Sequence, residues 1–113
     1  MVKSVVSVGD RRVELVHRAG TERDFFLVTD CGKIACFVEV EAKAAKNGYS
    51  RRLEKSFTFR FGPDEPATKA TAHNLCRALS LAKPVQLAFA LSEPSADLIS
   101  AVGSALRALQ DSN

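Results

Sequence analysis

Three short segments of the chain, residues 25–29, 34–38 and 85–91, are apolar at nearly every position. Successive side chains of a β-strand point to opposite faces of the sheet, so a strand with one wet face alternates apolar and polar residues. Strands without this alternation are typical of positions that are covered on both faces. The three segments therefore predict central strands, and the fold must supply apolar contacts on both sides of them.

Two strand pairs are expected to form hairpins. Residues 5–8 and 13–16 are β-branched stretches joined by a tight polar turn. Residues 25–29 and 33–41 follow, and we expect them to pair around a short turn in which Gly32 takes a positive φ. The first four strands are thus predicted to form two successive hairpins.

A fifth strand is predicted over residues 56–61, which alternate strictly between apolar and polar side chains. This alternation places Phe57, Phe59 and Phe61 on one face. The preceding residues, 42–50, have no apolar pattern and contain an Asn-Gly turn signal, so we expect an exposed hairpin loop there.

The first helix is predicted to start at a Gly-Pro-Asp-Glu-Pro segment. Asp64 or Glu65 can accept hydrogen bonds from first-turn amides, and Pro66 needs no amide hydrogen at that position. The helix is expected to run to about residue 82, because Pro84 prevents its continuation. Its predicted inner stripe comprises Ala67, Ala70, Leu75, Ala78, Leu79 and Ala82.

A second helix is predicted over residues 94–110, after another capping cluster. Its apolar stripe comprises Leu98, Ile99, Val102, Leu106 and Leu109. Together the elements predict an α+β fold: a six-stranded, mostly antiparallel sheet with two helices on one face, in the order β-β-β-β-β-α-β-α. No linker or repeat divides the sequence, so we expect a single domain over residues 1–113.

The second face of the predicted sheet needs a cover of its own. Two helices can shield only one face, although the central strands call for apolar contacts on both. Either the sheet curls and closes its second face on itself, or that face meets another subunit. We favour a partner subunit.

No residue cluster predicts catalysis or a cofactor. The two histidines and three cysteines lack zinc-site spacing, and nucleotide motifs such as G-x-G-x-x-G are missing. His73 and Cys76, three residues apart, could pair as a base and a nucleophile, but an amphipathic helix often carries such residues by chance. We therefore expect no enzymatic activity, no cofactor, and no catalytic, cofactor-binding or metal-binding residues.

The cysteines also indicate a compartment. An odd number without a C-x-x-C pair is typical of reduced thiols, so we expect a cytoplasmic protein, with the nucleus also compatible. Apolar runs fall far short of the roughly twenty residues of a membrane helix, and no signal peptide is recognisable. We expect no membrane partner.

The charge is uneven, although the net charge is only +3. Residues 43–60 carry six basic side chains against a single acid, Glu54. Three interpretations stay open: a solvated hairpin, a surface for an acidic protein, or a nucleic-acid contact, for which one short basic hairpin is a small footprint. The candidate partner-binding residues are Lys43, Lys46, Tyr49, Arg51, Arg52 and Lys55.

Two motifs resemble a known family. Leu27-Val28-Thr29 followed by Gly32-Lys33 resembles the central hairpin of proteasome assembly chaperone 3, a family of small dimeric chaperones for the 20S proteasome. The segment 62–75, with Gly-Pro-Asp-Glu-Pro and Ala72-His73-Asn74-Leu75, resembles its strand-to-helix junction. The matching positions, to which we assign a structural role, are Gly32, Lys33, Gly62, Asp64, Glu65, Pro66 and Asn74.

The resemblance implies a function without turnover. It implies a sheet flanked by helices, a dimer with itself or with the related assembly chaperone 4, and transient binding to proteasome α-subunits while the α-ring forms. No cofactor is implied, and nucleic acid is not an expected partner. The rival hypothesis is a nucleic-acid-binding or adaptor domain that uses the basic hairpin of residues 43–60.

Overall fold

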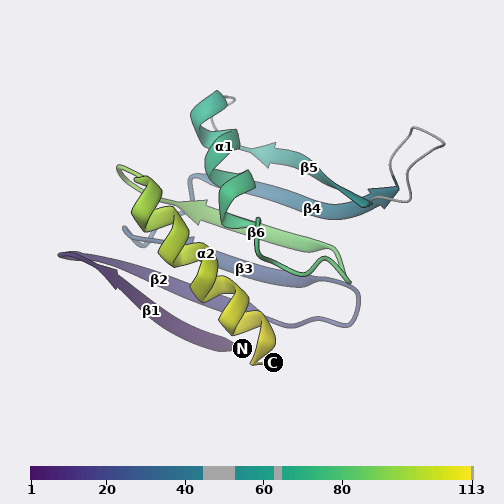
Figure 1. Cartoon of the computed structure of the whole chain (residues 1–113), viewed down its shortest axis with the longest axis horizontal. Coiled ribbons are helices and arrows are strands. Elements are labelled where there is room, and N and C mark those ends of the chain that lie inside the picture. The colour runs from purple at the N-terminus through teal and green to yellow at the C-terminus, as the bar shows by residue number, and fades with distance from the viewer. Residues whose placement is uncertain (45–52, 63–64, 113) are drawn as a thin grey trace.

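Six strands and two helices make up the part of the chain that the computed structural model describes, which is residues 1–44, 53–62 and 65–112. The elements are β1 (Val2–Val8), β2 (Arg11–Arg18), β3 (Asp24–Thr29), β4 (Cys36–Ala44), β5 (Leu53–Phe61), α1 (Pro66–Leu75), β6 (Val85–Ala90) and α2 (Ala96–Asp111). Both helices lie on the same face of the sheet (Figure 1). The predicted element order and the two-helix face are confirmed.

The strands form a mixed sheet in the order β1-β2-β3-β6-β4-β5. β3 and β6 are parallel, and the other neighbours are antiparallel, so the mostly antiparallel prediction holds. Two of the three continuously apolar segments, 25–29 and 85–91, occupy the centre as β3 and β6, which explains why they do not alternate. The third is only partly a strand: β4 starts at Cys36, later than predicted, and Ile34 lies before it, 49% exposed.

The predicted hairpin between residues 25–29 and 33–41 is wrong. β6 lies between β3 and β4, where Leu87 pairs with Phe26 on one side and Val38 on the other. A strand that returns through a helical crossover can insert parallel to an earlier strand, which a two-residue turn cannot achieve. The insertion gives β3 and β4 an apolar neighbour that no local turn signal reveals.

The hydrophobic core lies between the sheet and the helices. Alternate residues of the strands point into it, including Leu15, Phe26 and Leu87, all fully buried. From α2 the predicted stripe is confirmed, with Ile99 only partly buried; its fully or nearly buried members are Leu98, Val102, Leu106 and Leu109. Ser95 caps this helix by accepting a hydrogen bond from the Leu98 amide at 3.2 Å.

Helix α1 is shorter than predicted and ends at Leu75. Its buried residues are Thr71, Ala72 and Leu75, whereas Ala67 and Ala70 are exposed. The sequence expectation failed because a side chain from a distant strand completes the helix end. The Lys55 ammonium of β5 donates to the carbonyls of Cys76 and Arg77 at 2.7 and 2.8 Å.

A β-bulge changes the face on which β5 ends. Phe37 pairs with Phe61 and Val38 with Phe59, so Arg60 is an extra residue in β5. Phe59 therefore stays on the helix-covered side, together with Val38, while Phe61 moves to the opposite face. The prediction that the phenylalanines share one face is correct for residues 57 and 59 and wrong for residue 61.

Candidate protein-binding surface

The face of the sheet opposite the helices is left uncovered by the described residues, so the closure of the sheet on itself does not occur there. Five apolar side chains pair directly across it from β2 to β5. In strand order this apolar row comprises Val16, Leu27, Ala88, Phe37 and Phe61. It exists because the central strands are apolar on both faces and because the bulge adds Phe61.

The apolar row is continuous, and some of its side chains are exposed to solvent. Phe61 is 52% exposed, and its ring stacks on Phe37 with 6.1 Å between the ring centroids. Val16 and Leu27 are half-buried, while Ala88 is 1% exposed between its larger neighbours. An exposed apolar stripe of this kind typically marks an interface in a protein that is otherwise polar on its surface.

A second row, called the polar row because four of its five residues are polar, runs beside the apolar row. It pairs, in strand order, Arg18, Phe25, Gln86, Glu39 and Thr58. The Arg60 guanidinium, from the bulge, donates to Glu39 at 3.1 Å. This hydrogen bond lowers the pKa of Glu39, so the carboxylate stays charged at the surface. Apolar centre and charged margin together are the usual composition of a protein interface.

One end of this face is hollowed. A depression of about 470 Å³ is lined by Met1, Val16, Arg18, Gly20, Arg23, Phe25 and Gln86. It lies against the apolar row at Val16 and against the polar row at Phe25. A flat sheet offers little shape specificity, whereas a hollow of this kind can accept a protruding side chain.

Of the candidate partner-binding residues, the structure describes two. Lys43 is exposed at the end of β4, 3.4 Å from the Glu41 carboxylate, whereas Lys55 binds the end of α1. Their pairing with residues 54 and 42 places the two lysines on opposite faces of the sheet. The other four candidates, Lys46, Tyr49, Arg51 and Arg52, lie outside the described residues.

The family-motif glycines meet different demands. Gly62 has φ 120°, and a Cβ there would lie 2.9 Å from the Ala35 carbonyl oxygen and the Cys36 Cα. Gly32 has φ 72° in an open turn with free space around it, next to the exposed Lys33. Gly62 therefore allows a close approach of backbones, while Gly32 only allows a left-handed turn.

The other motif residues shape the start and the end of α1. Glu65 is the N-cap residue, without a capping hydrogen bond from its side chain, and Pro66 occupies the first turn. Asn74 accepts a hydrogen bond from Arg77 at 3.0 Å. Asp64 lies outside the described residues.

Cys76 does not form a nucleophile–base pair with His73. Burial raises the pKa of the Cys76 thiol to about 12, with Lys55 acting in the opposite direction, so the thiol is protonated at neutral pH. His73 is exposed and packs on the Phe57 ring at a centroid distance of 3.7 Å. The helical spacing was the only basis for this pair.

The described residues contain no group of three or more His, Cys, Asp or Glu side chains suited to a metal ion. Nor is any of their helices long and apolar enough to cross a membrane.

No sequence pattern predicted a buried polar cluster at the end of β2. His17 stacks on Phe26, with 4.3 Å between the rings, and its Nδ1 lies 3.3 Å from the Leu109 carbonyl oxygen. Its Nε2 is 3.6 Å from Asp24, which in turn lies 3.3 Å from the Lys83 ammonium. The cluster joins residues that are far apart in sequence, so only the fold could reveal it.

Comparison with known proteins matches the chain to a family and to solved structures. A family model described as proteasome assembly chaperone 3 matches residues 26–109. The fold is similar to a chain in the crystal structure of a novel chaperone complex for yeast 20S proteasome assembly, with a TM-score of 0.63 and 10% identity, over 96% of this chain and 93% of that chain. No curated protein gives a significant match. At so low an identity, the structural similarity shows the fold alone.

Proposed function

The chain belongs to the proteasome assembly chaperone 3 family, and we propose on this premise that it promotes formation of the 20S proteasome α-ring without catalysis. In this proposal the protein acts as a dimer that binds α-subunits transiently. Holding neighbouring subunits in register lowers the entropic cost of ring assembly. The chaperone leaves when later subunits occupy its surface.

The apolar row is the observation that most directly supports the proposed dimer. It crosses five strands on a face that no described element covers. In a two-fold dimer the same patch serves both subunits, so the apolar row of one subunit packs on that of the other, and the Glu39–Arg60 pair lies at the margin. A related assembly chaperone 4 subunit with a comparable face would fit in the same way.

Sedimentation velocity over a concentration series tests the dimer. We expect a dimer for the unchanged protein and a monomer for the double variant Phe37→Asp and Phe61→Asp, because it places two charges within the apolar row that the subunits share. Ile34→Asp is the matched control, since Ile34 is comparably exposed, at 49%, but lies outside the apolar row. A strict monomer at high concentration would refute the dimer.

Binding to α-subunits is tested separately with purified components. The immobilised protein is expected to bind isolated α-subunits reversibly, to accelerate ring formation on native gels, and to be missing from finished rings. Permanent retention in the rings would contradict transient binding. If the protein captures partners from lysate and nuclease treatment releases them, the nucleic-acid alternative is favoured.

Charge reversal at Arg51 and Arg52 addresses the basic hairpin. We predict that both substitutions slow association with isolated α-subunits, because a basic surface steers an acidic partner at low salt. Association rates measured by surface plasmon resonance at low and high salt check this. Unchanged rates at low salt would leave the hairpin without a role in binding.

A further inference from the structure

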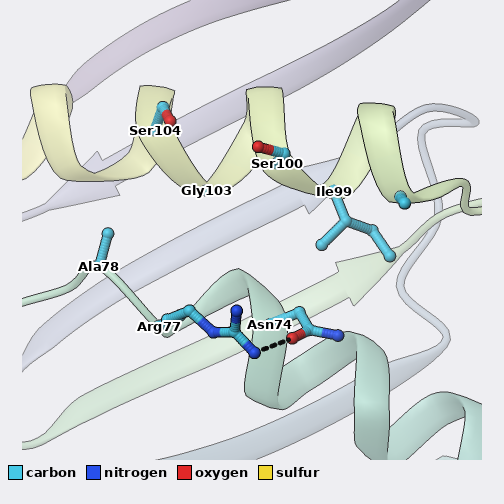
Figure 2. A pocket seen from close by; sticks show the side chains of 8 residues that line it. Asn74, Arg77, Ala78, Ile99, Ser100, Gly103 and Ser104 are labelled. Carbon is cyan, nitrogen blue, oxygen red and sulfur yellow. Dashed lines mark hydrogen bonds between the residues drawn. The ribbon is translucent and has the colours of Figure 1, made fainter.

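A groove lies between the two helices, on the side of the molecule opposite the apolar row. Figure 2 shows α2 along one wall and the end of α1 with the turn that follows along the other. The groove has a volume of about 360 Å³, which falls in the range of roughly 300–1,000 Å³ that is typical of ligand sites. Its lining residues are Asn74, Arg77, Ala78, Ala96, Ile99, Ser100, Gly103 and Ser104.

The polar groups of the groove offer mainly hydrogen-bond donors. Arg77 carries only donors, and one of them is used by the Asn74 carbonyl oxygen at 3.0 Å. This bond uses one lone pair of the Asn74 oxygen, and the Asn74 amide hydrogens form no hydrogen bond with another described residue. The hydroxyls of Ser100 and Ser104 form no hydrogen bond with another described residue. A ligand rich in acceptors suits such a lining.

The lining of the groove carries a single charged side chain, that of Arg77. None of the lining residues is acidic, and Arg77 pairs with no carboxylate among the described residues. The segment from residue 66 to residue 92 contains no Asp or Glu, whereas Asp97 is exposed on the first turn of α2 and is not among the lining residues.

The remaining lining is small and apolar. Gly103 is buried at the helix crossing, where a Cβ would be 3.6 Å from the carbonyl oxygens of Asn74 and Leu75. Ile99, Ala78 and Ala96 add an apolar surface. A single cation with this surface is a poor match for a nucleic-acid backbone, which needs several basic residues in a row. The combination suits a protein segment with a carboxylate next to an apolar side chain.

We propose that the groove between α1 and α2 is a docking site for an extended acidic segment of a partner protein, with Arg77 binding a carboxylate of that segment. The Asn74 amide and the two serine hydroxyls then bind its backbone carbonyls, and Ile99 contacts its apolar side chain. The volume admits a few side chains of an extended peptide but not a whole helix. This site is separate from the apolar row and goes beyond the proposed function.

The probe is a short acetylated and amidated peptide that alternates glutamate with leucine. It is titrated into the full-length ¹⁵N-labelled protein, with matched peptides that carry glutamine or lysine in place of glutamate. We expect saturable shifts at the Arg77 Nε–H, the Asn74 side-chain amide and the backbone amides of Ser100 and Ser104. The glutamine peptide is expected to bind about tenfold more weakly, because it lacks the charge-assisted hydrogen bond.

Charge exchange separates recognition from a structural effect. The Arg77→Glu variant is expected not to bind the glutamate peptide and to bind the lysine peptide more tightly. The Ser104→Glu variant is expected not to bind the glutamate peptide, because the new carboxylate pairs with Arg77. Arg12→Glu, an exposed change on β2, is the control and is expected to bind as the unchanged protein does. Thermal melting curves verify that each variant is folded.

Any of four results would overturn the proposal. Two concern the unchanged protein and the peptides: chemical-shift changes at residues outside the groove, or equal affinity for the glutamate and glutamine peptides. The other two are an Arg77→Glu variant that binds the glutamate peptide as tightly as the unchanged protein does, and tighter binding of oligothymidylate than of the glutamate peptide. None of these results bears on the dimer or on α-subunit binding, whose tests use other variants.

Discussion

At the scale of single residues, Asp30 shows how one side chain joins distant parts of the chain. Its carboxylate accepts hydrogen bonds from Arg11 at 2.8 Å and from the Ser92 hydroxyl at 2.7 Å, and Arg11 also donates to the carbonyls of Ser92 and Glu93. The network fastens the β1–β2 hairpin and the end of β3 to the start of α2. Burial opposes ionisation of Asp30, but the bonds from Ser92 and Arg11 outweigh it and lower its pKa.

Asp30→Asn should therefore alter the pH dependence of stability. Because the pKa of Asp30 is lower in the folded than in the unfolded protein, its contribution is present above about pH 4 and is lost as the pH falls through the folded-state value. We expect the variant to be less stable by about 1–3 kcal/mol at pH 7. The difference should shrink towards pH 3.

Urea unfolding of both proteins at several pH values measures this difference. Glu22→Gln, at an exposed position, serves as the control and should stay within about 0.5 kcal/mol of the unchanged protein. A difference between the unchanged protein and the Asp30→Asn variant that is constant with pH would mean that the carboxylate charge is not what stabilises the network.

At the scale of elements, the junction between β5 and α1 depends on a close backbone approach. Gly62→Ala adds a Cβ that would lie 2.9 Å from the Ala35 carbonyl oxygen and from the Cα of Cys36, the first residue of β4. It also places a side chain at a φ of 120°, which L-residues rarely adopt. We expect a loss of about 2–3 kcal/mol. Gly32→Ala, with a positive φ but nothing within 4 Å, should lose only about 1 kcal/mol. Denaturant midpoints for the two variants provide the comparison, and equal losses would show that only φ matters.

At the scale of the whole molecule, the uncovered sheet face predicts stability that depends on concentration. If dimerisation through the apolar row is coupled to folding, the Tm of the unchanged protein rises with protein concentration. The double variant at Phe37 and Phe61 should have a Tm that is independent of concentration. Scanning calorimetry over a wide concentration range checks this, and a concentration-independent Tm for both proteins would argue against a coupled dimer.

Much of the fold is determined by local patterns in the sequence. Whether apolar and polar residues alternate along a segment depends only on neighbouring residues. The six strands, the distinction between central strands and strands with one exposed face, and the apolar stripe of α2 could therefore all be predicted. The need for a second cover on the sheet follows from the same patterns, and with it the expectation of a partner. The family motifs at residues 62–75 likewise lie within one contiguous segment.

Only the tertiary structure decided which elements meet. The insertion of β6 beside β3, the end of α1 at Lys55, and the groove at Arg77 all join residues that are far apart along the chain. The bulge at Arg60 also depends on the partner strand, and it is what brings Phe61 into the apolar row. Local patterns specify how each segment is folded and which faces are apolar. The pairing of those faces follows from packing and hydrogen bonding over the whole chain.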